Sequence, residues 1–201
     1  MKNDLDYIKK AFKDHRSVIF DLDNTIYPEI SFLENRYKLI SKEVFGEDWE
    51  GPYKFLLNEF EIHGRKNIFN KLISQFDLKL SSADILKIFR NYKNNTIAIT
   101  PYPWFKKLSD ELEKNFSLLI ITNGNPVQQR FKLKMLNLNE FFPSINCIFA
   151  DEYGGKPGKG PYEALAKEIA LHKPIYIGDS LVDSDFCNNC NFEFLDVKNL
   201  K

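Results

Sequence analysis

The chain has 201 residues, of which 43% are hydrophobic and 28% charged, a composition typical of a globular protein with a full core. Its 28 basic residues balance 28 acidic ones, so the charge gives no reason to expect a nucleic acid polymer or an anionic membrane as partner. The longest apolar run, "LLII" at 118–121, is too short to cross a bilayer, and residues 1–17 lack the apolar core of a signal peptide. We therefore expect a cytoplasmic protein.

The first strand-like run is "SVIFD" at 17–21, and it leads into two aspartates, Asp21 and Asp23. Four further apolar runs follow, with helical patterns at 125–138 and 160–171 between them. These runs lie at 117–122, 146–150, 174–179 and 192–197. They are nearly continuous rather than alternating, as expected for strands covered on both faces. Strands that alternate with helices predict an α/β fold, a doubly wound Rossmann-like parallel sheet of five strands.

The segment between the first and second strands contains only helix-like patterns. It is too long for one crossover and too periodic for a loop. We therefore predict a Rossmann-like catalytic core formed by residues 1–27 and 98–201, and an inserted all-helical cap formed by residues 28–97. A lid that leaves the core just after Asp23 is well placed to select a substrate.

The predicted strand ends carry carboxylates, a hydroxyl group and ammonium groups. In chain order these are Asp21 and Asp23, Thr122 and Asn123, Lys156 and Lys159, and Asp179 and Asp183. In an open parallel sheet, ligands bind at the carboxyl ends of the strands, so these groups are expected to meet. Acidic strand ends repel one another unless a cation lies among them, and oxygen-only ligation suits Mg²⁺. A hydroxyl group and an ammonium group supply the donors that a phosphate requires.

In these motifs the sequence resembles the haloacid dehalogenase-like (HAD) hydrolase superfamily. The four motifs stand as "DLDNT" at 21–25, "TN" at 122–123, the lysine of "GGKP" and "GDSLVD" at 178–183. The resemblance covers essentially the whole chain, and the insertion after the first motif matches the C1 cap type. The surroundings of the second motif look like the phosphatase branch, and "DNTIYP" is similar to pyrimidine 5′-nucleotidases.

The resemblance implies separate roles for the aspartates. Asp21 would be the nucleophile that forms an aspartyl-phosphate, and Asp23 would protonate the leaving oxygen and then activate water. Mg²⁺ would be held by Asp21, the backbone carbonyl of Asp23 and Asp179, with Asp183 in support. The second aspartate of the fourth motif stands four or five positions after the first, and Asp183 fits the shorter spacing.

The resemblance also implies how the phosphate is bound. Thr122 would hold a phosphate oxygen, together with backbone N–H groups around Leu22 and Asn123. Lys156 would neutralise the transferring group and steady the nucleophile. The third motif reads "KPGKGP", so Lys159 is a rival, and we favour Lys156 because it keeps the Lys-Pro pair. The expected substrate is a small phosphorylated metabolite, with a nucleoside 5′-monophosphate as one candidate.

Other activities remain open alternatives. A sugar phosphomutase keeps the same four motifs, whereas a carbon–halogen hydrolase needs no acid at position 23. A non-catalytic receiver-like phospho-acceptor would use an aspartate after the third strand, here Asp151, but would lack the helical insertion. The pair Cys187 and Cys190 has no second pair of ligands at zinc spacing, so we expect these side chains to pack inward.

Overall fold

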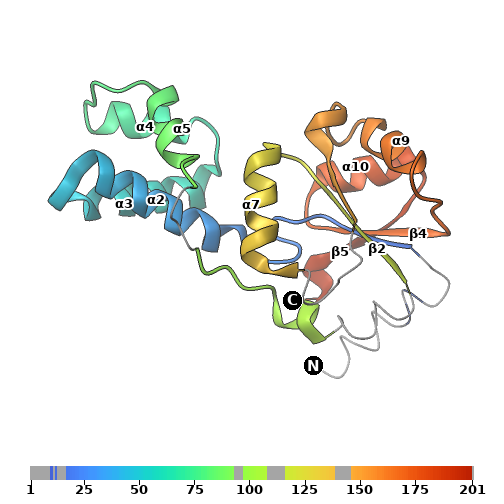
Figure 1. The fold of residues 1–201 in the computed structure, drawn as a ribbon. Coiled ribbons are helices and arrows are strands. Elements are labelled where there is room, and N and C mark those ends of the chain that lie inside the picture. The colour runs from blue at the N-terminus through green and yellow to red at the C-terminus, as the bar shows by residue number, and fades with distance from the viewer. Residues whose placement is uncertain are drawn as a thin grey trace. The chain divides into compact units, whose positions relative to one another are not determined.

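The structure is a computed structural model that describes residues 10, 12, 17–92, 97–107, 116–138 and 146–200. The chain divides into two compact units (Figure 1). Unit 1 comprises Met1–Glu29 and Ile99–Lys201, and unit 2 comprises Ile30–Ala98. Unit 1 contains the strands, and unit 2 is a helical insertion between the first and second of them.

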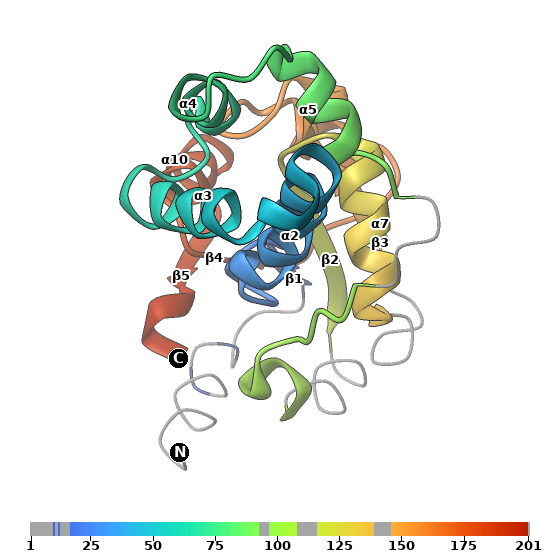
Figure 2. The ribbon, with the colours of Figure 1, turned by 90° about the vertical axis from the view of Figure 1, so that its left-hand side faces the viewer.

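Unit 1 is built on a five-stranded parallel sheet with the strand order β3-β2-β1-β4-β5, which can be followed across Figure 2. The strands are β1 (Ser17–Phe20), β2 (Ser117–Thr122), β3 (Asn146–Phe149), β4 (Pro174–Gly178) and β5 (Glu193–Asp196). Phe20 pairs with Ile120 of β2 and with Ile177 of β4, so β1 is central and wholly buried. The predicted α/β class and five-stranded parallel sheet are confirmed.

Helices cover both faces of this sheet. They include α7 (Pro126–Leu136), α9 (Gly160–Ala166) and α10 (Leu181–Cys190). Side chains alternate between the faces of a strand. On one face, Ile19 and Tyr176 belong to a buried cluster with Leu165 of α9 and Phe186 of α10. On the other face, the ring of Phe20 packs edge-on against Phe105, with centroids 5.5 Å apart, and α7 side chains lie beside β2 and β3.

The topology places a switch point beside β1. The chain runs from β1 to β2 and β3 on one side, then returns to β4 and β5 on the other. The carboxyl ends of β1, β2 and β4 therefore meet where the strand order reverses. Open α/β sheets bind ligands at this position.

The end of α9 differs from the sequence prediction. The helix predicted over 160–171 ends at Ala166, where Lys167 N–H donates to Ala164 O and Glu168 N–H to Leu165 O, bonds that tighten the chain into a turn. The apolar side chains of Ile169 and Leu171 suggested a longer helix, and they pack against the buried cluster from irregular chain instead.

Unit 2 is helical. It contains α2 (Glu29–Phe45, whose first residue is counted in unit 1), η1 (Gly46–Asp48), α3 (Glu50–His63), α4 (Ile68–Gln75) and α5 (Ser82–Phe89). Helix α5 begins with a capping box in which Ser81 and Asp84 each bond the other's backbone N–H. Aromatic side chains form its core, with rings in contact between Phe32 and Phe89 and between Phe55 and Phe76.

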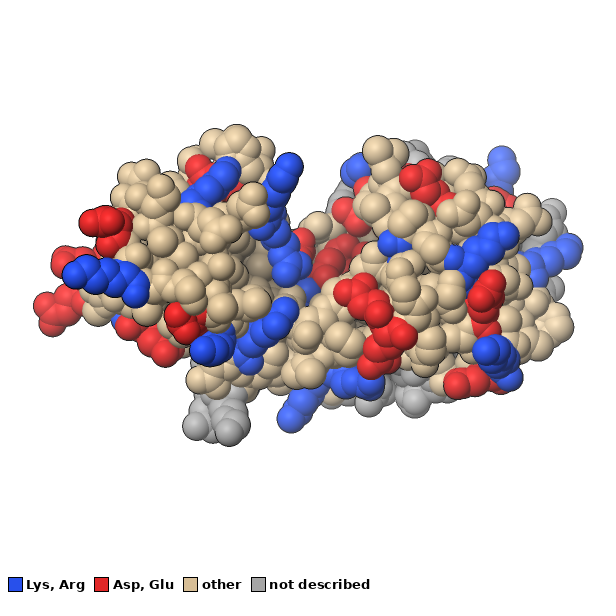
Figure 3. All heavy atoms as spheres, turned by 90° about the horizontal axis from the view of Figure 1, so that it is seen from above, with Lys and Arg blue, Asp and Glu red and all other residues tan. Residues whose placement is uncertain are grey.

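The surface of the described residues carries both signs of charge. On the face drawn in Figure 3, basic and acidic side chains are interspersed, in keeping with the balanced composition. Among the helices that the structure describes, none combines the length and apolarity required to traverse a bilayer.

Candidate active site

The loop after β1 fixes the first pair of aspartates. Asp21 N–H donates to Ile177 O at 2.8 Å, which extends the ladder one residue beyond β1 and holds Asp21 at the sheet edge. Asn24 then adopts a left-handed conformation with φ 57°, which asparagine tolerates better than most residues. Its Oδ1 accepts from Glu29 N–H at 3.0 Å, so the turn leads directly into α2. The sequence DLDN thus ends a strand and turns the chain within four residues.

All the predicted site residues line one pocket of about 280 Å³ in unit 1. These residues are Asp21, Asp23, Thr122, Asn123, Lys156, Asp179 and Asp183. They come from the carboxyl ends of β1, β2 and β4, from the start of α10 and from the loop before α9. The rival Lys159 is exposed at the start of α9 and does not line this pocket.

Lys156 is buried and bridges two carboxylates. Its Nζ lies 2.7 Å from Asp21 Oδ1, 2.6 Å from Asp183 Oδ1 and 2.7 Å from the Tyr176 hydroxyl. Burial alone would lower the pKa of Lys156, but Asp21 and Asp183 raise it, so the ammonium form is favoured. Asn123 holds the Lys156 backbone from both sides, accepting from its N–H at 2.8 Å and donating to its carbonyl at 3.0 Å. The Lys156–Pro157 peptide bond is cis.

Three carboxylates form a candidate cation site. One oxygen each from Asp21, Asp179 and Asp183 lie within 4.8 Å of one another, the only such acidic, His or Cys group among the described residues. This all-oxygen donor set fits Mg²⁺. Burial raises the pKa of Asp21 to about 7, and repulsion from the carboxylates of Asp183 and Asp23 contributes to this rise. The Lys156 ammonium group acts in the opposite direction and lowers the pKa of Asp21. A cation among these groups would relieve that repulsion.

The start of α10 orients Asp183. Ser180 is the N-cap, and the Asp183 carboxylate accepts from the Ser180 backbone N–H at 3.2 Å and from its hydroxyl at 2.6 Å. Steric contact explains why the "GDS" motif begins with glycine, because a Cβ at Gly178 would lie 2.7 Å from the Asp183 side chain. Asp185, two residues further on, is exposed and lies outside the pocket.

The motif "TNGNP" follows β2, and each residue has a local role. Thr122 ends the strand, and Gly124 adopts φ 113°, a conformation that glycine alone adopts readily. Asn125 caps α7 by accepting from Gln128 N–H at 3.2 Å, and Pro126 occupies the first helical turn. The start of α7 is therefore fixed next to Thr122.

The carboxylate of Asp23 stands apart from the cation site and is held by three side chains that the sequence analysis missed. Lys132 Nζ lies 2.8 and 2.7 Å from its two oxygens, Gln129 Nε2 lies 3.0 Å from Oδ2, and the Tyr27 hydroxyl donates to Oδ1. Burial alone would raise the pKa of Asp23, but the Lys132 ion pair and these hydrogen bonds lower it. The one sequence signal for this contact is that "PVQQRFKLKML" lacks a clean apolar stripe.

Two further sequence expectations concern residues outside this pocket. Asp151, the residue that a receiver-like protein would use, is exposed on η2 (Ala150–Tyr153) and does not line the pocket. Cys187 is buried in the core cluster and Cys190 packs against it. Within the described residues neither belongs to a group of metal-ligating side chains.

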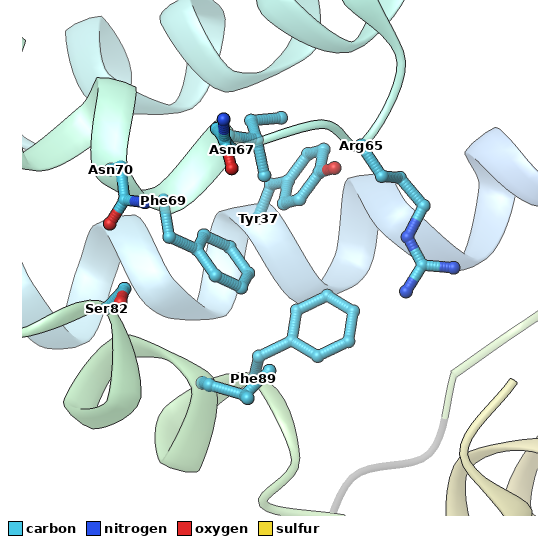
Figure 4. A pocket seen from close by; sticks show the side chains of 9 residues that line it. Tyr37, Arg65, Asn67, Phe69, Asn70, Ser82 and Phe89 are labelled. Atoms are coloured by element: carbon cyan, nitrogen blue, oxygen red, sulfur yellow. The ribbon is translucent and has the colours of Figure 1, made fainter.

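Unit 2 contains a pocket of its own, of about 190 Å³. Figure 4 shows the rings of Tyr37, Phe69 and Phe89 close together, with Arg65, from the turn between α3 and α4, to the right of these rings. Asn67, Asn70 and Ser82 also line it. The sequence analysis did not predict this cavity.

Comparison with known proteins identifies the family. A profile of the family described as haloacid dehalogenase-like hydrolase matches residues 18–197. A curated relative, the glyceraldehyde 3-phosphate phosphatase of Methanocaldococcus jannaschii, is 26% identical over 85% of this chain and 78% of its own length. Another of the same name, from Pyrococcus abyssi, is 25% identical over 82% of this chain and 73% of its own.

A solved structure shares the fold. The HAD hydrolase YfnB of Bacillus subtilis, described as bound to magnesium, superimposes with a TM-score of 0.64 at 20% identity, covering 90% of this chain and 87% of that one. The resemblance read from the four motifs is thus confirmed at the level of the superfamily. The chain belongs to the haloacid dehalogenase-like hydrolases.

Proposed function

We propose that the protein is a cytoplasmic, Mg²⁺-dependent phosphatase that hydrolyses a small phosphorylated metabolite through an aspartyl-phosphate on Asp21. The observation that carries the proposal is the convergence of two differently held carboxylates, Asp21 and Asp23, with Lys156 and Thr122 in one pocket. Two curated relatives with phosphatase names support it.

In the first step, an Asp21 carboxylate oxygen attacks phosphorus. A new O–P bond forms, the ester P–O bond breaks, and the leaving oxygen takes a proton from Asp23. Asp23 must carry that proton against the effect of Lys132, which lowers its pKa. Lys156 offsets the negative charge between Asp21 and the incoming phosphate, and the Thr122 hydroxyl donates to a phosphate oxygen.

In the second step, Asp23 removes a proton from water as the water oxygen attacks the aspartyl-phosphate. The bond between Asp21 and phosphorus breaks, inorganic phosphate leaves, and both aspartates return to their first state. The two carboxylates are held separately, because Asp21 contacts Lys156 while Asp23 contacts Lys132. The Lys132 ion pair lowers the pKa of Asp23 and so favours its charged form, which suits the role of base in this second step.

The cation would be held by the carboxylates of Asp21 and Asp179, with Asp183 in support and the Asp23 backbone carbonyl as a further oxygen. When bound, Mg²⁺ screens the repulsion between the anionic nucleophile and the phosphate dianion. The neighbour described as bound to magnesium supports this choice of ion.

For the substrate we propose a three-carbon sugar phosphate first, because both curated relatives are named for glyceraldehyde 3-phosphate. A nucleoside 5′-monophosphate is the alternative that the "DNTIYP" segment suggests. We propose that unit 2 serves as the substrate-selecting cap.

The test is phosphate release by the purified protein with Mg²⁺. We expect hydrolysis of p-nitrophenyl phosphate, loss of activity with EDTA, and recovery on adding excess Mg²⁺. Asp21→Asn is expected to abolish turnover. A panel of glyceraldehyde 3-phosphate, glycerol 3-phosphate, UMP and CMP then ranks the substrates by kcat/KM.

Two results would contradict the proposal. Full activity of Asp21→Asn would exclude Asp21 as the nucleophile. Isomerised sugar phosphate without released phosphate would identify a mutase instead.

A further inference from the structure

Helix α7 presents polar side chains to the protein interior. Gln128, Gln129 and Lys132 are all buried, and Lys132 has 0% of its surface exposed. A buried lysine is costly unless its charge is paired, and a buried ion pair is weak evidence for stability. Apolar residues at these positions would serve packing better, so the polar face calls for another explanation.

For Lys132 and Gln129 the explanation lies in what their side chains contact. Lys132 Nζ lies within 2.8 Å of both oxygens of Asp23, 109 residues away in sequence. Gln129 stands one helical turn earlier on the same face, and its Nε2 lies 3.0 Å from Asp23 Oδ2 and 2.7 Å from Thr122 Oγ1. One amide group thus links the carboxylate at the end of β1 to the hydroxyl at the end of β2.

The direction of these hydrogen bonds matters. In this structure the Thr122 hydroxyl donates to Asn123 O at 3.3 Å. Because the Gln129 amide donates to Thr122 Oγ1, that hydroxyl hydrogen can turn from the carbonyl to a phosphate oxygen bound in the pocket that Thr122 lines. Gln129 Nε2 also lies 3.0 Å from Asn123 O, whereas its buried Oε1 has no hydrogen-bond partner among the residues that the structure describes. The amide is therefore oriented by acceptors at the site and not by general packing.

The ion pair also separates Asp23 from the acidic group. Asp21, Asp179 and Asp183 approach one another, while both oxygens of the Asp23 carboxylate are engaged by Lys132 on α7. Without Lys132, the Asp23 side chain would lose the contact that fixes both its oxygens. A displaced general acid lowers the reaction rate even when the fold is intact.

We propose that Lys132 and Gln129 are positioning residues for the hydrolysis. Lys132 holds the acid–base carboxylate of Asp23, and Gln129 couples that carboxylate to the phosphate-binding hydroxyl of Thr122. This inference rests on the proposed function, because it acts through the roles assigned there to Asp23 and Thr122.

The test compares two esters that differ in their need for an acid. p-Nitrophenolate is a weak base and leaves without a proton, whereas the alkoxide of glycerol 3-phosphate needs one. We expect Lys132→Met to lower kcat/KM for glycerol 3-phosphate by about 10²-fold and for p-nitrophenyl phosphate by about threefold or less. Lys132→Arg, which keeps the charge, is expected to recover most of the loss. Lys134→Met on the exposed side of α7 is the matched control and should match wild type.

A double-mutant cycle separates positioning from folding. If Lys132 acts through Asp23, then Lys132→Met adds no further loss of kcat/KM in an Asp23→Asn background. The double variant also removes both buried charges, so it is expected to melt at a higher temperature than Lys132→Met alone.

Gln129→Met tests the second contact. It is expected to raise KM for both esters several-fold, with Gln128→Met, a buried neighbour on the same helix, as the control.

An equal loss of kcat/KM on both esters in Lys132→Met, or additive losses in the cycle, would reduce Lys132 to a structural residue. Wild-type protein that hydrolyses neither ester would overturn the proposed function, and the positioning role with it.

Discussion

The Lys156 ammonium group lies 2.7 Å from Asp21 Oδ1, and both side chains are buried at the carboxyl edge of the sheet. Through a second contact, at 2.6 Å to Asp183, the same ammonium group bridges two of the carboxylates that line the pocket and offsets part of their negative charge. In the proposed mechanism this lysine would keep the attacking oxygen of Asp21 in position and reduce its repulsion from a phosphate.

Replacing this lysine tests that arrangement. We expect Lys156→Met to lower kcat for p-nitrophenyl phosphate by about 10²- to 10³-fold, because a preorganised charge at the reacting group is lost. Lys159→Met is the matched control, since Lys159 is exposed at the start of α9. Equal losses in the two variants would contradict the assignment of Lys156 to the third motif.

The Mg²⁺ concentration that activity requires is expected to depend on the Asp179 carboxylate. In Asp179→Asn we expect the Mg²⁺ concentration for half-maximal activity to rise by about tenfold or more, because a neutral amide is a weaker ligand for a hard cation. Asp185→Asn, an exposed carboxylate on α10, should leave the Mg²⁺ requirement unchanged. Steady-state rates over a Mg²⁺ titration provide the measurement. An unchanged requirement in Asp179→Asn would remove Asp179 from the cation site.

Gly178→Ala should disturb the same carboxylates through sterics. The new Cβ would lie 2.7 Å from the Asp183 side chain, so Asp183 must shift from its contacts with Lys156 and Ser180. We expect thermal denaturation to show a loss of about 1–3 kcal/mol, together with reduced activity. Gly51→Ala in α3 is the control, because its Cβ would meet no atom within 4 Å. In a helix that substitution should be neutral or stabilising.

The sequence predicted much of this site because of one topological rule. The carboxyl ends of parallel strands lie at one edge of the sheet. The proximity of Asp21, Thr122 and Asp179 could therefore be predicted from the sequence alone. The same apolar runs predicted all five strands to within two residues at either end. The end of α9 was wrong because Ile169 and Leu171 continue the apolar pattern after the helix has stopped.

Lys132 and Gln129 could not be predicted in this way. A lysine within a charged helical segment reads as a solvent-facing residue, and its burial depends on how α7 packs against the loop after β1. That contact joins residues 109 positions apart, and neither helical period nor local propensity encodes it. The structure is needed wherever a functional contact involves the middle of a helix and not the end of a strand.

The cysteines should be unreactive at neutral pH. Burial raises the pKa of Cys147 to about 12 and that of Cys190 to about 11, from 9.0. The thiolate is the reactive form, and its fraction at pH 8 should be about 10³-fold lower for Cys147 and about 10²-fold lower for Cys190 than for a thiol of ordinary pKa. Disulfide exchange with a colorimetric reagent should therefore be slow at both residues, although a thiolate of higher pKa is the better nucleophile. The exchange rate should then rise with pH until the raised pKa is reached. Protein unfolded in guanidinium provides the reference, and a native thiol that reacts at the unfolded rate would contradict the burial of that residue.

Unit 2 contains a buried arginine whose removal should destabilise it. Arg36 is 1% exposed, and its Nη2 donates to Ile88 O at 2.9 Å and Asn91 O at 3.0 Å, at the end of α5. Its guanidinium carbon lies 5.8 Å from the ring centroid of Phe89, which adds a cation–π contact. A cation at this position stabilises the carbonyl groups at the C-terminal end of a helix. Burial lowers the pKa of Arg36, but an arginine still remains charged at neutral pH.

Arg36→Met should therefore lower the free energy of unfolding by about 2–4 kcal/mol, because two carbonyls lose their donor inside the protein. Some of the loss is offset, since the variant no longer buries a charge or the Nε atom, which has no hydrogen-bond partner within the described part of the chain. Arg90→Met, an exposed arginine at the same helix end, is the control and should change stability by less than about 0.5 kcal/mol. Urea unfolding followed by circular dichroism gives both values. If Arg36→Met proved as stable as Arg90→Met, the offset would equal the lost hydrogen bonds and the arginine would not hold α5 in place.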